Sequence, residues 1–257
     1  MGETREEEIL KRHVKDLAQK SYRQNVYTFS GFLSEADQDA LFCIQKDLSY
    51  ISWTLFGGSE DAERKIVRFG SEQDLGYEEA WPICLLKIEP LLKKFADDLS
   101  HRDFLGALMN LGIDRSTLGD IYVQENVGYV WCLQSIADYI KESLDQVKHT
   151  NVRVVDADPL TELKAQEPQE EEVLVSSSRI DGVISHLYHL SRSESIELFR
   201  TQKVRVNGRA CENNSYMLKA SDGVSVRGYG KFTYEGLQGE TRKGKERVRL
   251  LVYRAGK

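Results

Sequence analysis

The sequence lacks the features that three large classes of protein require. No stretch approaches the roughly eighteen uninterrupted apolar residues of a membrane-spanning helix, so we expect no membrane segment. The first residues are charged and hold no apolar run like that of a secretory signal, which favours a soluble, cytoplasmic protein. The four cysteines are scattered and form no C-x-x-C pair. Their spacing argues against both a disulfide framework and a zinc finger.

A kinase-like triplet occurs without the other kinase motifs. His101–Asp103 has the letters that open a kinase catalytic loop, but Asn110 is out of register, and there is no glycine-rich loop or D-F-G. The triplet is therefore better explained as the start of a helix. The alternative is a polar patch, formed with Arg115 and Asp120, that touches RNA.

Charge is distributed unevenly along the chain. Residues 176–257 hold 16 Lys and Arg against 8 Asp and Glu, a formal charge of +8. Residues 1–175 hold 19 against 33, a formal charge of −14. A basic end on an acidic body is typical of a polyanion-binding protein with a separate scaffold, although a basic segment can also be a solvated surface.

The beginning of the chain predicts a small α/β domain at residues 1–75. Apolar residues at helical spacing predict a helix over residues 1–20, and Ser34 is placed to cap a second helix. Strands are expected at Ser52–Phe56 and around Ile66–Phe69, joined by a glycine turn.

Residues 76–158 predict a middle domain with the order β-α-β-β-α-β, which fits a ferredoxin-like, RRM-like fold. The expected elements are strand Ile83–Ile88, helix Asp103–Leu111, strands Ile121–Gln124 and Tyr129–Leu133, helix Ile136–Val147 and strand Val152–Val155. Three aromatic residues of these strands, Tyr122, Tyr129 and Trp131, either pack in a core or stack on bases. Core packing is favoured, because the RRM's own aromatic and glycine signature is missing.

A segment rich in glutamate and proline follows the middle domain. Residues 156–172 predict a linker, to which residues 173–175 can add a strand. A third domain is expected at residues 176–257. The fold class that these patterns predict is therefore α+β, with an N-terminal α/β unit, a middle RRM-like domain and a C-terminal domain.

The third domain begins with a predicted pair of helices. Apolar residues at helical spacing predict a helix over Arg179–Leu190. Ser191–Glu194 has the S-x-x-E form of a capping box, so a second helix is expected to begin at this serine and end near Gln202. Two apolar faces joined by so short a connection must pack on each other, which leaves the basic side chains outward. Val204–Val206 predicts a strand, and Asn207-Gly208 a hairpin turn.

This segment resembles the RNA-binding domain named after small-subunit ribosomal protein S-four. The similarity is carried by Arg179–Asp181, Ser191–Ser195, Lys203–Gly208 and Ser221–Val224, in that order and with matching gaps. It implies that the two helices and the following strand hold structured RNA through its backbone. By position, the implied RNA contacts are Arg179, Ser191, Arg192, Arg200, Lys203, Arg205 and Asn207. A helix N-terminus and arginine forks both suit phosphate, while the alternative is a solvated helix face.

Two positions depart from the S-four pattern. Gln202 stands where a glycine usually ends the second helix, and Ser195 stands where alanine is common. His186 and His189 lie three positions apart on the first helix, but no third metal ligand is evident in the sequence. We therefore expect no metal, and no motif suggests a cofactor.

The rest of the chain is similar to the YlmH family. Phe32-Leu33, Gly57-Gly58 with Ala62–Lys65, His101–Leu108 and Gly119–Ile121 carry this resemblance. It implies a bacterial protein with the three domains described above, encoded near cell-division genes. It also implies a ribosome-associated role, with ribosomal RNA or tRNA on the large subunit as the partner. Within these motifs, Ala62–Lys65 is either a salt-bridged structural corner or an intermolecular contact.

Three functions are consistent with these patterns. The first is a non-catalytic protein that binds structured RNA on the ribosome through its C-terminal domain. The second is a protein-interaction scaffold for cell division with secondary RNA binding. The third is an RNA-modifying enzyme, because S-four domains also occur in pseudouridine synthases, tyrosyl-tRNA synthetases and methyltransferases. No H-I-G-H, K-M-S-K-S or glycine-rich cofactor loop appears, so we expect no catalytic residue and no small-molecule substrate.

Overall fold

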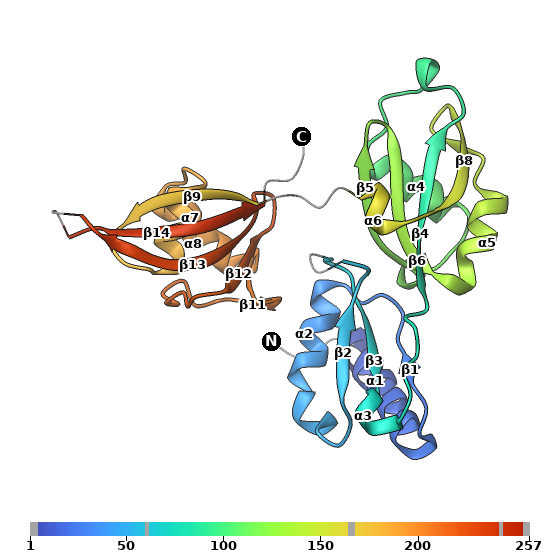
Figure 1. Ribbon diagram of the computed structural model, residues 1–257, viewed down its shortest axis with the longest axis horizontal. Coiled ribbons are helices and arrows are strands. Elements are labelled where there is room, and N and C mark those ends of the chain that lie inside the picture. The colour runs from blue at the N-terminus through green and yellow to red at the C-terminus, as the bar shows by residue number, and fades with distance from the viewer. Residues whose placement is uncertain (1–4, 60–61, 164–167, 242–243, 254–257) are drawn as a thin grey trace. The chain divides into compact units, whose positions relative to one another are not determined.

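The computed structural model describes residues 5–59, 62–163, 168–241 and 244–253. The chain divides into two compact units, Met1–Lys164 and Ala165–Lys257 (Figure 1). The first unit contains two sheets and the second contains one, and all strand pairs are antiparallel. This mixture of helices and antiparallel sheets confirms the predicted α+β class. Each of the three predicted domains has a sheet of its own, but the division of the first unit into two domains stays a prediction.

The beginning of the first unit is a three-stranded sheet packed against helices. Its elements are α1 Arg5–Gln24, β1 Thr28–Phe29, α2 Glu35–Cys43, a 3-10 turn Gln45–Leu48, β2 Trp53–Phe56, β3 Ile66–Phe69 and α3 Glu72–Leu75. The sheet order is β1-β3-β2. The predicted cap of α2 is confirmed, because Ser34 and Asp37 bond each other's backbone N–H groups in a capping box.

The middle of the chain is a five-stranded sheet of order β5-β6-β4-β8-β7. Its elements are β4 Ile83–Pro90, a 3-10 turn Lys93–Phe95, α4 His101–Asn110, a 3-10 turn Arg115–Thr117, β5 Leu118–Gln124, β6 Val127–Leu133, α5 Gln134–Ser143, β7 Gln146–Val147 and β8 Thr150–Ala157. The predicted order β-α-β-β-α-β is present. The predicted end of α5 is wrong, because the chain leaves the helix after Ser143 and its buried Val147 pairs with Thr150 in a short hairpin.

The second unit is a six-stranded sheet of order β11-β10-β12-β13-β14-β9, with one helix pair on one of its faces (Figure 1). Its elements are β9 Gln169–Val175, α7 Ile180–Leu187, α8 Arg192–Arg200, β10 Val204–Val206, β11 Arg209–Ala210, β12 Asp222–Val226, β13 Gly230–Glu240 and β14 Glu246–Tyr253. The core lies between the helices and the sheet. It contains Ile180, Val183, Ile184, Phe199, Val224, Phe232, Val248 and Leu250.

The predicted linker at residues 156–172 is largely structured, so its bounds are wrong. Residues 156–157 close β8, and α6 follows at Pro159–Glu162. β9 then begins at Gln169 and pairs along its whole length with β14. β9 begins with Gln169 and three glutamates, so its sequence shows no apolar alternation that would predict a strand there. In the structure, Val175 is its one fully buried residue. The C-terminal unit therefore begins before Ser176.

Candidate nucleic-acid interface

Helices α7 and α8 are held as a pair by apolar packing and by one buried hydroxyl. Ser191 caps α8, its side-chain oxygen accepting from the N–H of Glu194, whose carboxylate returns to the Ser191 N–H at 2.8 Å. This confirms the capping box and the start of the helix. Ser195 is buried and donates to the carbonyl of Asp181 in α7 at 2.9 Å. The serine that replaces the usual alanine thus fastens one helix to the other.

The end of α8 explains why a glycine is usual at position 202. Gln202 has a backbone φ of +52°, in the left-handed region that L-residues with a Cβ adopt at a cost. Its N–H bonds the carbonyl of Phe199, and the next N–H, of Lys203, reaches back to Leu198 at 2.8 Å. This is the geometry with which a helix ends before a strand. The chain keeps the turn despite the substitution.

Four of the seven predicted RNA contacts lie on the exposed side of this helix pair. Ser191, Arg192, Arg200 and Lys203 are all exposed. Arg192 occupies the first position of α8, beside the unpaired N–H groups of the helix start. No ion-pair partner of Arg192 is found within the described residues. Arg200 stands eight positions later and forms a weak exposed pair with Glu197 at 3.2 Å.

The other three predicted contacts have structural roles. Arg179 forms a two-pronged ion pair with Asp181 at 3.0 and 2.7 Å, and this bond raises the pKa of Arg179. Arg205 is buried and donates to the carbonyl of Gly208 at 2.7 Å. Asn207 accepts from the Gly223 N–H and donates to Asp222, both at 2.9 Å. All three side chains are engaged within the chain, and the burial of Arg205 does not suit a phosphate contact.

The Asn207-Gly208 hairpin is confirmed. Both residues have positive φ angles, +52° and +78°, and they join Val206 to Arg209 directly. Two positive φ angles in a two-residue loop define the turn type that matches the twist of a hairpin. Asp222 is buried beneath this turn and accepts from Asn207, Tyr216 and the Lys219 N–H. The turn is therefore fixed to β12 by a fully bonded carboxylate.

The strand aromatics of the middle domain are packed away from solvent. Tyr129 and Trp131 are 6% and 5% exposed and belong to one apolar cluster with Phe32 and Ile66 of the first sheet. The Tyr129 hydroxyl also donates to Glu162 of α6 at 3.0 Å. Core packing of these two residues is confirmed. The half-buried Tyr122 hydroxyl lies 3.3 Å from that of Ser59.

The Ala62–Lys65 motif forms a structural corner between the two sheets of the first unit. The Arg64 guanidinium donates to the carbonyls of Leu118, Phe32 and Arg115 at 2.9, 3.0 and 3.1 Å. The Asp120 carboxylate accepts from the backbone N–H groups of Glu63 and Arg64. Burial raises the pKa of Asp120. The intermolecular alternative loses its support, since these donors and acceptors are used within the chain.

Arg115 completes this corner. Its guanidinium donates to the carbonyls of Leu118 and Gly119 at 2.6 and 3.2 Å. Burial and the nearby Arg64 lower the pKa of Arg115 to about 10. His101 lies near this group, and burial followed by repulsion from Arg115 lowers the pKa of His101. Arg115 and Asp120 are half-buried, and their hydrogen bonds within the chain disfavour the polar patch as an RNA-facing surface.

Sequence reasoning missed a pair of neighbouring thiols. Cys84 of β4 and Cys132 of β6 are register partners, and their sulfurs lie 3.7 Å apart. The hydrogen bond between them lowers the pKa of Cys84 and raises that of Cys132. Only strand pairing reveals the contact, because 48 positions separate the two residues in the chain. Elsewhere in the described residues, no three His, Cys, Asp or Glu side chains gather as a metal site would require.

Three comparisons relate the chain to known proteins. A family model described as "Putative RNA-binding domain in YlmH" matches residues 77–162. Among curated proteins, "Ribosome-associated protein quality control protein P2" of Bacillus subtilis (strain 168) is 28% identical over 239 residues, which cover 91% of this chain and 89% of that protein. Among solved structures, "Cell division protein ylmH from Streptococcus pneumoniae" matches with a TM-score of 0.51 and 18% identity, covering 64% of this chain and 98% of that chain. At this identity the structural likeness concerns the fold.

These matches indicate both the class of this protein and the family that it resembles. The chain is an α+β protein that carries an RNA-binding domain of the kind found in YlmH. The family model, the relative and the structural neighbour together support a YlmH family protein, in agreement with the motifs from Phe32 to Ile121. No helix among the described residues is long and apolar enough to cross a membrane.

Proposed function

We propose that this protein binds structured RNA of the ribosome through the exposed side of α7 and α8. The observation that carries the proposal is the arrangement of Ser191, Arg192, Arg200 and Lys203 around the start and side of α8. Phosphate is favoured at a helix N-terminus by free N–H groups and by the helix dipole. Arginine adds a planar fork that matches phosphate oxygens. The resemblance of this segment to the S-four domain supports the same surface.

The partner we propose is ribosomal RNA, with tRNA, on the large ribosomal subunit. The support is the Bacillus subtilis relative, which is named as a ribosome-associated protein and aligns with 91% of this chain. Association with ribosomes would place the protein in the cytoplasm. A link to cell division, in which the protein would act as a protein-interaction scaffold, stays a prediction.

We propose further that the protein is not an enzyme. Its candidate surface consists of cations and a helix cap, which suit positioning of a polyanion. Among the described residues, Cys84 is a potential nucleophile whose thiol has a lowered pKa. Its hydrogen-bond partner is a second thiol, that of Cys132 in the neighbouring strand. Within the described part of the chain, the Cys84 thiol has no hydrogen bond to a histidine or carboxylate that could act as a general base. An RNA modification that depends on this protein and disappears on mutation of an acidic residue in residues 1–175 would contradict the proposal.

The RNA interface is tested by salt dependence with the full chain. We expect binding to large-subunit RNA and to a duplex–loop RNA at low salt, with the logarithm of affinity falling linearly with the logarithm of salt concentration. The measurement is fluorescence anisotropy across a salt series. Absence of binding at low salt would contradict the proposal. A fragment that carries the activity should begin near residue 165, because β9 belongs to the C-terminal sheet.

A further inference from the structure

The middle domain matches an RNA-binding family, but the sheet face that would bind RNA is covered. Residues 77–162 match the family model with an RNA-binding description. An RRM-like sheet binds RNA by stacking bases on the aromatic side chains of its open face. Here Tyr129 and Trp131 of that face are buried against Phe32, Ile66 and α6. Any RNA contact made by this domain therefore requires another surface.

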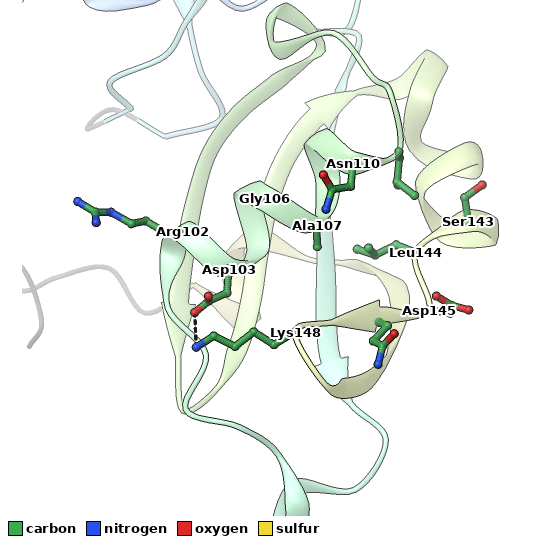
Figure 2. Close-up of a pocket in the computed structure, with 11 residues that line it drawn as sticks. Arg102, Asp103, Gly106, Ala107, Asn110, Ser143, Leu144, Asp145 and Lys148 are labelled. Carbon is green, nitrogen blue, oxygen red and sulfur yellow. Dashed lines mark ion pairs between the residues drawn. The ribbon is translucent and has the colours of Figure 1, made fainter.

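A groove lies on the helical side of the domain, between α4 and the segment that leaves α5 (Figure 2). Its volume is about 470 Å³, within the usual range of about 300–1,000 Å³ for ligand sites. Gly106 and Leu144 contribute to its apolar surface, and the Leu144 side chain points toward α4 (Figure 2). Asn110 and Asp145 supply exposed polar groups along it.

The charges of the groove favour a base over a bare phosphate. Lys148 is paired with Asp103 at 2.9 Å, so neither is an uncompensated charge. Asp145 is exposed on the segment that leaves α5 (Figure 2). The segment 77–162 holds 8 Lys and Arg against 15 Asp and Glu, a formal charge of −7 that repels a polyanion. Amide and carboxylate groups suit the hydrogen-bonding edges of a base.

Arg102 is a cation at the edge of the groove. It is exposed at the start of α4, and its side chain extends away from the groove (Figure 2). No hydrogen bond or ion pair of its side chain is found within the described residues. An RNA strand that leaves the groove past the start of α4 would bring a phosphate toward this side chain. A free base lacks that phosphate, so the arrangement suits a nucleotide.

We propose that this groove binds a single unpaired nucleotide of the RNA. The inference rests on the proposed function, since the acidic middle domain needs the C-terminal unit to supply most of the affinity for the same RNA molecule. A base extruded from its stack is read by contacts to its edges in a pocket. Asn110 and Asp145 would make those contacts, Ala107 would pack on the ring, and Arg102 would hold a phosphate.

Gly106 offers a way to fill the groove without disturbing the fold. A Cβ added at this position meets no atom within 4 Å, and the residue lies in a regular helix without a positive φ. Gly106→Trp should therefore block the groove, and Gly106→Ala should leave it open in an otherwise matched protein. Arg102→Gln removes the phosphate contact. Its matched control is Arg12→Gln, an equal charge change at an exposed position of α1.

The experiment compares two RNAs with the full-length protein. One is a blunt hairpin, and the other is the same hairpin with a short single-stranded tail of mixed sequence. Anisotropy should show about tenfold tighter binding of the tailed RNA, equal to ~1.4 kcal/mol. Gly106→Trp and Arg102→Gln should abolish this difference and leave blunt-hairpin affinity unchanged, while Gly106→Ala and Arg12→Gln should retain it. A 4-thiouridine in the tail should crosslink to peptides from α4 or residues 143–148.

The outcomes separate this inference from the proposed function. Equal affinity of the wild type for both RNAs, or a tail effect that survives Gly106→Trp, would overturn the groove and leave hairpin binding intact. Loss of blunt-hairpin binding by the wild type would instead contradict the proposed function, and crosslinking of the tail would then decide the groove by itself. A free nucleoside monophosphate added to the blunt hairpin should not raise the affinity of that hairpin to the level of the tailed RNA. Binding of this nucleotide to the wild type and not to Gly106→Trp would support the groove.

Discussion

The middle domain and the C-terminal unit show two ways of building a surface from a sheet and two helices. In the middle domain, the sheet is covered on both faces, by α4 and α5 on one side and by the first sheet with α6 on the other. In the C-terminal unit, α7 and α8 cover one face of the sheet and carry the exposed cations themselves. The middle sheet thus buries Tyr129 and Trp131, whereas α8 exposes Arg192 and Arg200. Burial therefore distinguishes the open face of the middle sheet from the surface that we propose for RNA.

The largest expected effect comes from removing the two arginines of α8. Arg192→Ala with Arg200→Ala should weaken RNA binding by about 2–4 kcal/mol, at roughly 1–3 for each good contact. Most of this should come from Arg192, because Arg200 already pairs with Glu197. The salt slope should fall by about one per lost phosphate contact. RNA titrations across a salt series measure both.

A matched control keeps that result interpretable. Arg227→Ala removes one exposed cation from the β12–β13 turn of the same unit, so its effect reports charge alone. Both arginines of α8 are exposed, and folding should stay close to wild type. Unchanged affinity in a normally folded double variant would place the RNA surface elsewhere. A collapsed melting temperature would show that these side chains pack structurally.

The packing of the first sheet over Trp131 is tested at Gly58. Its φ is +98°, and an added Cβ would lie 2.2 Å from the Trp131 ring. Gly58→Ala should therefore lower the free energy of unfolding by about 2 kcal/mol or more, through backbone strain and overpacking. Gly106→Ala, in open space on α4, should instead raise it by up to about 1 kcal/mol. The denaturant midpoints of the two variants measure this difference. Equal stability of the two variants would mean that the two sheets are not packed through Trp131.

A smaller stabilisation is expected at the end of α8. Gln202→Gly should raise the free energy of unfolding of the C-terminal unit by about 0.5–1 kcal/mol, because glycine adopts φ of +52° without a Cβ clash. Gln202→Ala keeps the Cβ and should give no such gain. Thermal or denaturant unfolding of the full chain measures the difference. A glycine variant no more stable than the alanine variant would show that this position carries no strain.

The smallest effect concerns pH and Asp103. Hydrogen bonds from Ser100, together with Lys148, lower the pKa of Asp103 to about 2. The unfolded value is about 3.9, so the stability that this carboxylate contributes is present above that pH and is lost as the pH falls toward 2. Asp103→Asn should make the acid side of the stability profile shallower. Glu142→Gln, at an exposed position of α5, should leave it unchanged; an equal flattening in both would remove Asp103 as the cause.

Local chemistry decided much of the fold before any tertiary contact. The capping boxes at Ser34 and Ser191 and the turn at Asn207-Gly208 are confirmed, because each depends on side chains within a few positions. The positions of the exposed arginines on α8 follow from helical spacing in the same way. Apolar periodicity likewise gave the order of the middle strands and helices.

What the sequence could not determine depends on partners far along the chain. Glu170–Glu172 carry no apolar alternation, and only pairing with β14 makes them a strand. Near neighbours can also escape a sequence pattern: Arg179 and Arg205 match the RNA-binding pattern by position, yet Asp181 and Gly208, two and three positions away, engage them. The contact of Cys84 with Cys132 and the burial of Trp131 beneath the first sheet likewise need the assembled unit. Spacing fixes which side of a helix a residue occupies, but only tertiary packing decides whether that side meets solvent, a carboxylate or another sheet.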